Sequence, residues 1–171
     1  LSLIQESIDR ISRTVRTLVD FSKPIAPKQE ENIHLNNVIE NVIRIVKYDK
    51  RLKHQNIKTE LQPQLPLVVG SYDQIQQVFV NICLNAADAM EGLPNGGLVL
   101  KTWTTDDQIH ASISDNGSGI TEKDQKHIFE PFFTTKKSGK GTGLGLWVSY
   151  NIINGMNGSI TVESQVNEGT T

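Results

Sequence analysis

The sequence of 171 residues contains one cysteine and no long hydrophobic run, and both shortages exclude classes of protein. Cys83 cannot form a disulfide within the chain or supply a cysteine-based zinc site, which suits a reducing cytoplasm. No apolar stretch approaches the roughly 20 residues that cross a bilayer, and the first residues do not resemble a signal peptide. We therefore expect a soluble, cytoplasmic chain without membrane contact, with any membrane segment lying elsewhere in a longer protein.

The sequence also lacks an excess of positive charge. Its 17 Lys and Arg residues and 19 Asp and Glu residues give a net charge of −2. A nucleic-acid binder needs clustered Lys and Arg to neutralise phosphates, so we expect no nucleic-acid partner. The length suits one domain with a single core and a short appendage.

The appendage is the N-terminal stretch. Apolar residues recur there at alternating spacings of three and four, at Leu1, Ile4, Ile8, Ile11, Val15 and Leu18. This heptad pattern predicts one long helix over residues 1–24 that buries its apolar seam against partner helices, and the prolines at 24 and 27 end it. We favour a homodimer through residues 1–22; the alternative is a helix that packs on its own domain. Residues 25–32 are then a linker.

Residues 33–171 carry helical and strand patterns in mixed order. Helices are predicted at residues 35–52, 72–90 and 144–154, and strands at 56–62, 98–104, 108–114 and 159–164. The strands at 98–104 and 108–114 form a hairpin across an Asp-Asp turn. Because helices and strands do not alternate strictly, we expect the α+β class: a two-layer α/β sandwich with helices on one face of a sheet, preceded by the long helix.

Two asparagines on the helix at 72–90 are candidate metal or phosphate ligands. Asn81 and Asn85 lie about one turn apart, so their amides can point into the same space. An amide oxygen is a hard, neutral ligand that suits Mg²⁺, which also takes phosphate oxygens and waters. Without the motifs described next, a solvated helix face would be the better interpretation of these two residues.

A glycine-containing turn, DNGSGI at residues 115–120, follows directly on the strand at 108–114. Gly117 and Gly119 let the backbone approach a ligand, and the Asp115 carboxylate can accept a hydrogen bond from an exocyclic amine. Ile120 can cover a flat ring. These features suit adenine, and an ordinary turn is the alternative.

A second glycine-rich stretch, GKGTGLGL at residues 139–146, opens the helix at 144–154. The amides and the positive dipole end of a helix N-terminus attract phosphate. Neither the P-loop nor the dinucleotide fingerprint fits, because Gly141 and Leu146 stand at positions that those motifs give to other residues. We therefore expect a third kind of phosphate loop and disfavour a flexible linker.

Residues 128–136 contain three phenylalanines and lead into a lysine-bearing stretch. This composition suggests a lid with a packed root and a moving tip. We expect Phe129 and Phe132 to anchor the segment, while Lys136, Lys137 and Lys140 reach towards phosphate. Surplus core residues are the alternative explanation of the phenylalanines.

Four stretches occur together in one order: NICLNAADA at 81–89, DNGSGI at 115–120, FEPFFTTK at 129–136 and GKGTGLGL at 139–146. They resemble the N, G1, F and G2 boxes of the sensor histidine kinases of two-component systems, within the Bergerat-fold (GHKL) superfamily. The resemblance covers about residues 33–171, and residues 1–24 resemble the last helix of the family's dimerisation domain. It implies a catalytic ATP-binding domain that uses ATP and Mg²⁺.

The resemblance implies a role for each matching residue. Asn85 binds Mg²⁺, Asn81 contacts the phosphates or the metal, and Asp115 holds the adenine amino group. Thr170 assists Asp115 through water. The implied nucleotide site comprises Asn81, Asn85, Asp115, Gly117, Gly119, Ile120, Phe132, Thr135, Gly141, Thr142, Gly143, Leu144, Gly145, Leu146 and Thr170.

One position separates a kinase from a hydrolase. Gyrase and chaperone relatives carry a glutamate at the place of Asn81, where it activates water, whereas an amide cannot accept a proton. We therefore expect ATP to be kept for transfer to an imidazole, with Asn81, Asn85, Lys136 and Lys140 as catalytic residues. Asp88 stands where many relatives have a basic residue, and we assign it no charge-stabilising role.

None of the four histidines matches the family's phosphate acceptor, which has an acidic residue on its C-terminal side. We expect His34, His54, His110 and His127 to be structural or solvated. The chain should therefore not phosphorylate itself, and the acceptor should lie on the first helix of the dimerisation bundle, outside this sequence.

The resemblance predicts transfer of the γ-phosphoryl group to that histidine and onward to an aspartate of a response-regulator receiver domain. Two alternatives stay open. The first is an ATPase or anti-sigma-factor serine kinase of the same fold, and the second is a non-catalytic, nucleotide-sensing dimerisation module.

Overall fold

The structure is a computed structural model that describes residues 30–136 and 141–171. The predicted helix at 1–24, most of the predicted linker, Lys137 and Lys140 lie outside the described residues. Within them, helices and strands follow the order β1 (Glu31–Ile33), α2 (Leu35–Val46), β2 (Asn56–Leu61), β3 (Val68–Gly70), α3 (Tyr72–Ala89), β4 (Gly97–Thr105), β5 (Gln108–Asp115), α4 (Glu122–Gln125), α5 (Gly145–Gly155), β6 (Ser164–Gln165) and β7 (Gly169–Thr170).

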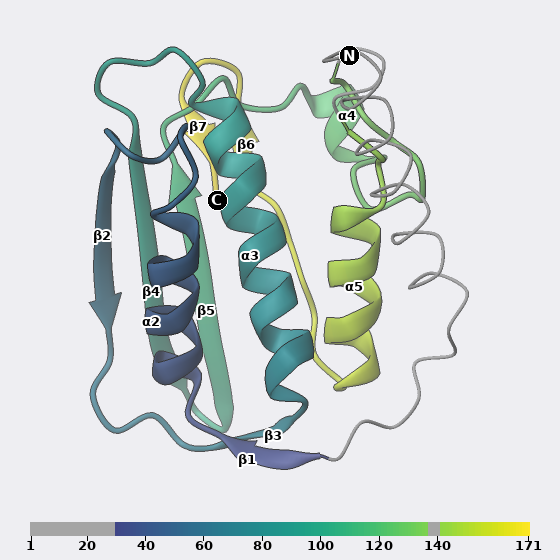
Figure 1. Cartoon of the computed structure of the whole chain (residues 1–171). Coiled ribbons are helices and arrows are strands. Elements are labelled where there is room, and N and C mark those ends of the chain that lie inside the picture. The colour runs from purple at the N-terminus through teal and green to yellow at the C-terminus, as the bar shows by residue number, and fades with distance from the viewer. Residues whose placement is uncertain (1–29, 137–140) are drawn as a thin grey trace, which may run out of the picture.

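The main sheet has the strand order β2-β4-β5-β7-β6 and is covered on one face by helices. Figure 1 shows α2, α3 and α5 over that face, with α3 between the other two. Strands β2 and β4 run parallel, and the remaining neighbours are antiparallel. Strands β1 and β3 form a separate two-stranded sheet. The predicted α+β class and its two-layer sandwich are confirmed.

The β4–β5 hairpin forms because both segments alternate inward and outward residues. Leu98, Leu100 and Thr102 of β4 are buried, whereas Lys101 between them is exposed. The turn places Asp106 in the left-handed region, with a φ of 49°, a conformation that aspartate tolerates better than most residues. The predicted hairpin is confirmed.

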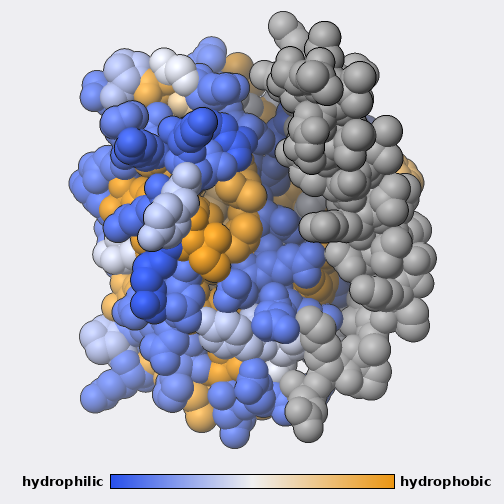
Figure 2. All heavy atoms as spheres, viewed as in Figure 1, coloured by the Kyte–Doolittle hydropathy of each residue, from blue (hydrophilic) through white to orange (hydrophobic). Residues whose placement is uncertain are grey.

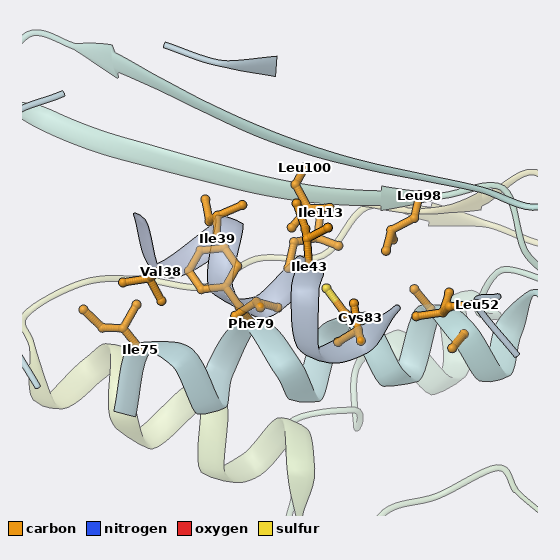
Figure 3. Packing of buried hydrophobic residues seen from close by; sticks show 14 of the residues in the cluster. Val38, Ile39, Ile43, Leu52, Ile75, Phe79, Cys83, Leu98, Leu100 and Ile113 are labelled. Atoms are coloured by element: carbon orange, nitrogen blue, oxygen red, sulfur yellow. The ribbon is translucent and has the colours of Figure 1, made fainter. Parts of the chain in front are cut away.

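The core lies between this hairpin and two amphipathic helices. Figure 3 shows Ile39 and Ile43 of α2 close to Leu100 of β4, with Phe79 and Cys83 of α3 beneath them. Each buried aliphatic or aromatic side chain of this kind contributes about 1.5–3 kcal/mol. The core fixes α3 against the sheet and thereby positions Asn81 and Asn85 of the same helix.

Helix α2 ends at Val46, six residues before the predicted end at residue 52. A continued helix would place Leu52 about 120° around the helix axis from Val46, off the buried face. Instead, turns follow, and the backbone amide of Arg51 donates to the carboxylate of Asp49 at 2.9 Å. This local bond competes with helix, and the turns bring Leu52 back onto the core, where it is 2 % exposed.

The predicted strand at 159–164 is wrong over most of its length, since β6 begins only at Ser164. A strand needs a hydrogen-bonded neighbour, and alternation in sequence does not supply one. β5 pairs with β7 at a single register, Asp115 opposite Thr170, and residues 159–162 join neither sheet, whereas Glu163 exchanges two backbone hydrogen bonds with Thr171 next to the β6–β7 ladder. Strand β1 begins within the predicted linker, and β3, α4 and β7 have no counterpart in the sequence prediction.

The face that carries the helices is mostly hydrophilic, with an apolar patch among the polar side chains (Figure 2). No helix of the described residues is long and apolar enough to cross a membrane.

Candidate functional site

One cavity brings the predicted site residues together. Its walls come from α3, the end of β5 with the loop after it, residues 128–136 and the start of α5. The lining includes Asn81, Asn85, Asp115, Gly119, Ile120, Phe132, Thr135, Lys136, Gly141, Thr142, Gly143, Leu144, Gly145, Leu146 and Thr170. Among the predicted residues that are described, Gly117 is absent from this lining.

Asn81 connects α3 to α5. Its side-chain amide donates to the carbonyl oxygen of Gly145 at 3.2 Å and approaches the hydroxyl oxygen of Ser149 at 3.5 Å. The buried Ser149 hydroxyl also donates to the Gly145 carbonyl, at 3.0 Å. These bonds orient the Asn81 amide towards the glycine-rich helix start, with its nitrogen on the α5 side.

Asn85 contacts a cation of the chain itself. The ammonium of Lys136 donates to the Asn85 side-chain oxygen at 3.0 Å and also forms an ion pair with Asp88. Asn85 and Asp88 are three residues apart on α3, so their side chains lie on one face of the helix. The oxygen that the sequence assigns to a metal therefore faces positive charge in this structure.

Arg51, which the sequence analysis did not single out, extends this cluster. Its guanidinium forms ion pairs with Asp88 and with Asp49, the latter at 2.6 Å. The hydrogen bond from Arg51 lowers the pKa of Asp49 to about 2. Arg51 and Asp49 lie in the charged stretch after α2, and no sequence spacing distinguishes Arg51 there from its lysine neighbours.

Asp115 is the last residue of β5, and its carboxylate accepts a hydrogen bond from the Gly117 amide at 2.8 Å. Burial raises the pKa of Asp115, and backbone hydrogen bonds from Gly117 and Thr170 oppose this rise. A half-buried carboxylate that lines a cavity provides an acceptor for an N–H donor of a ligand.

The loop after Asp115 is fixed by the β6–β7 hairpin. The amide of Ile120 donates to the Ser164 hydroxyl, and the amide of Asn167 donates to the Ser118 carbonyl, both at 2.8 Å. Ser164 also contacts the Thr170 hydroxyl at 2.9 Å. Ser164 is a second functional residue that the sequence analysis missed, because only the fold brings it to this loop.

The loop requires glycine at positions 117 and 119 for different structural reasons. Gly119 has a φ of 67°, and an added Cβ would lie 2.0 Å from the carbonyl oxygen of Gln165. An added Cβ at Gly117 would lie 2.7 Å from the backbone of Ala89 on α3. Gly117 therefore permits close packing behind the loop, whereas Gly119 is in the cavity wall.

The segment at 128–136 is anchored differently from the prediction. Ile128 is buried, and Phe129 contacts Tyr150 of α5 with ring centroids 5.5 Å apart. The predicted anchoring by the Phe132 side chain is wrong, because Phe132 is 57 % exposed. Its backbone fixes the segment instead: Phe132 has a φ of 68°, and its amide donates to the Gly143 carbonyl at 2.9 Å.

The glycine-rich stretch leads into α5, which begins at Gly145 with Leu144 as its N-cap. Leu144 is buried, and the Thr142 hydroxyl accepts a weak hydrogen bond from its amide at 3.4 Å. The buried leucine fixes the helix start, and the first turn of an α-helix points its amides away from the helix, where they can bind an anion. This start lies next to Asn81.

The cavity therefore combines two sets of groups. Asp115 with the loop at 117–120 offers an acceptor for a polar N–H donor, while Asn85, Lys136 and the start of α5 offer groups that bind metal or phosphate. Such a combination suits a nucleotide.

Comparison with known proteins gives matches along the whole chain. Residues 70–171 match the family model described as histidine kinase-, DNA gyrase B- and HSP90-like ATPase. The signal transduction histidine-protein kinase AtoS of Escherichia coli (strain K12) is 37 % identical over 172 residues, which cover 100 % of this chain and 28 % of AtoS. The chain thus spans little more than a quarter of that relative.

Two solved structures have the same fold. Full-length ShkA in complex with AMPPNP has a TM-score of 0.84 at 21 % identity, covering 99 % of this chain and 36 % of ShkA. The histidine kinase ThkA in complex with the response regulator protein TrrA has a TM-score of 0.75 at 23 % identity, covering 98 % of this chain and 47 % of ThkA.

Proposed function

The chain belongs to the histidine kinase-, DNA gyrase B- and HSP90-like ATPase family, as the ATP-binding catalytic domain of a sensor histidine kinase, and we propose that its cavity presents Mg·ATP to a histidine outside this sequence. The convergence of Asn85, Asp115 and the glycine-rich start of α5 on one cavity carries this proposal. These groups come from segments far apart in the chain, and each suits a different part of the nucleotide.

Asp115 recognises the base. Its carboxylate oxygen accepts from Gly117, which orients the carboxylate, and the second oxygen is suited to the exocyclic amine of adenine. Gly119, Ile120 and Thr170 complete the wall around the base. The β6–β7 hairpin holds this wall through Ser164, so the base meets a preformed surface.

The phosphates bind at the start of α5. Backbone amides and the helix dipole stabilise the phosphate charge, and Gly141, Thr142, Gly143, Leu144, Gly145 and Leu146 form the loop. Phe132 and Thr135 contact the nucleotide from the other side of the cavity. The positive charges of Lys136 and Lys140 stabilise the negative charge on the γ-phosphoryl group during its transfer.

Asn85 is suited to Mg²⁺, because an amide oxygen is one of the neutral ligands that this cation accepts. Among residues 30–136 and 141–171, no three or more His, Cys, Asp or Glu side chains form a group that could hold a metal. A magnesium ion at Asn85 would therefore take most of its ligands from phosphate and water. Its chemistry would be to neutralise charge on the transferred group.

Asn81 favours transfer over hydrolysis. Its amide nitrogen faces Gly145 and Ser149, and an amide has no basic group that could remove a proton from water. Neither an ATPase nor a serine kinase is favoured, since relatives such as AtoS and ZraS of Escherichia coli are histidine kinases.

The proposal extends to partners. We infer that residues 1–22 form a homodimer with the acceptor-bearing helix, and that the phosphoryl group passes to an aspartate of a response-regulator receiver domain in the cytoplasm. The complex of ThkA with TrrA supports a response regulator as partner.

The test supplies the chain with Mg·ATP and a separate dimerisation domain that carries the acceptor histidine. We expect phosphate on that domain that is labile to acid, and slow release of free phosphate in its absence. Asn85→Ala should abolish transfer, while Asn154→Ala at the exposed end of α5 should not. Rapid steady hydrolysis by the chain alone, or acid-stable phosphate, would refute the proposal.

A further inference from the structure

Asp88 lies between two cations that come from different parts of the chain. Arg51 approaches from the turns after α2, and Lys136 approaches from the segment before the glycine-rich stretch. The side chains of Asp88 and Lys136 are 29 % and 32 % exposed, so solvent screens their interaction only in part. All three residues line the cavity of the candidate site.

The arginine is itself held in place. Two of its side-chain nitrogens bond the Asp49 carboxylate, at 2.6 and 2.8 Å, which is the two-point geometry of a strong guanidinium–carboxylate pair. The hydrogen bond to Asp49 raises the pKa of Arg51 further above its ordinary range. Arg51 therefore presents a fixed positive charge to Asp88.

The lysine at the other end has a second contact. The Lys136 ammonium lies 3.0 Å from the Asn85 oxygen, the group proposed to hold the metal. The four charges Asp49, Arg51, Asp88 and Lys136 alternate in sign, and their sum is zero. A carboxylate at Asp88 would by itself repel a triphosphate, so its presence at this cavity needs a reason.

We propose that Asp88 is a positioning residue that holds the Lys136 ammonium beside Asn85, at the phosphate end of the nucleotide site, with Arg51 fixing Asp88. This inference rests on the proposed function. A lysine side chain has four rotatable bonds and loses rotamer freedom when it is fixed. The ion pair with Asp88 fixes the lysine before the nucleotide binds, so this loss does not weaken nucleotide binding. The fixed ammonium therefore favours ATP, which has a third phosphate, over ADP.

A double-mutant cycle separates positioning from simple charge. The affinities of the 171-residue chain for Mg·ATP and Mg·ADP are measured by calorimetry for the wild type, Asp88→Asn, Lys136→Met and the double variant. In the wild-type background we expect Lys136→Met to lower the preference for ATP over ADP about tenfold. In the Asp88→Asn background, the same change should lower it less than threefold, because an unheld lysine contributes little.

The cycle cancels the direct repulsion between Asp88 and phosphate, since this repulsion is present with either residue at position 136. Glu91→Gln, in the turn just after α3, serves as the matched control: Glu91 also lines the cavity, and its replacement removes one negative charge but should leave the Lys136 effect at about tenfold.

Two outcomes overturn the inference. An equal Lys136 effect in both backgrounds means that Asp88 does not position the lysine, and a larger effect without Asp88 means that the carboxylate competes with phosphate for it. In either case, tight binding of ADP keeps the proposed function intact. A wild-type chain that bound neither nucleotide would instead overturn the proposed function.

Discussion

Replacement of Gly119 by alanine tests how the adenine side of the cavity is built. At a φ of 67°, alanine is strained by about 1–2 kcal/mol. The new Cβ would also lie 2.0 Å from the carbonyl oxygen of Gln165, a backbone atom that cannot rotate away. The β6–β7 hairpin must therefore move off the loop.

That movement breaks two hydrogen bonds, from Ile120 to Ser164 and from Asn167 to Ser118. At about 1 kcal/mol each, together with the strain, they give a loss of about 3–4 kcal/mol in the free energy of unfolding. Because the same hairpin holds the wall of the base site, Mg·ATP affinity should fall more than tenfold.

Two control variants separate strain from displacement. Gly92 has a φ of 84° but no heavy atom within 4 Å of an added Cβ, so Gly92→Ala should cost only about 1–2 kcal/mol and leave affinity unchanged. Gly155 has neither constraint, and Gly155→Ala should not destabilise the chain. Urea unfolding and calorimetry measure both quantities. Equal losses of stability in Gly119→Ala and Gly92→Ala, with intact ATP binding, would refute the role given to the hairpin.

Three further outcomes are expected. Asp115→Asn should weaken Mg·ATP binding at least tenfold in calorimetry without lowering the free energy of unfolding at pH 7. Burial raises the pKa of Asp115, so the charged carboxylate disfavours folding. The free energy of unfolding of the wild type therefore rises as the pH falls through that raised pKa. Asp49→Asn should cost about 1 kcal/mol at pH 7. This difference should fade in thermal melts as the pH falls from 3.8 through about 2, because the stabilisation from a lowered pKa is complete only above the unfolded value and is lost as the pH falls through the folded value. Cys83, whose pKa burial raises to about 12, should not react with an aromatic disulfide reagent at pH 8 until urea unfolds the chain.

The sequence predicts the parts of this fold whose pattern is local. The helix at 72–90 and the hairpin of β4 and β5 follow from apolar periods of 3.6 and 2, and both are confirmed to within about one residue. The glycines and Asp115 could be found because the backbone at those places demands special residues. Their meeting in one cavity is a result of the fold.

The parts that the sequence does not predict depend on distant partners. Arg51 and Asp88 are 37 residues apart, and nothing in either neighbourhood indicates the ion pair between them. The short strands β1 and β3 exist only because they pair with each other. The prediction for Phe132 failed because an aromatic side chain was assumed to be buried, whereas its backbone makes the fixing contact. The domain boundaries and the roles of single site residues stay predictions.

The bond between Asn81 and Gly145 has a consequence for how the activities of this superfamily can diverge. A glutamate at position 81 would supply a base, but it would also turn carboxylate oxygen towards the Gly145 carbonyl, where an amide hydrogen now lies. Two acceptors facing each other without a donor cost about 1–3 kcal/mol in a half-buried setting. An evolutionary route from phosphotransfer to hydrolysis therefore requires at least one accompanying change on α5, and a single substitution at this place should produce a weakened kinase before it produces a useful ATPase.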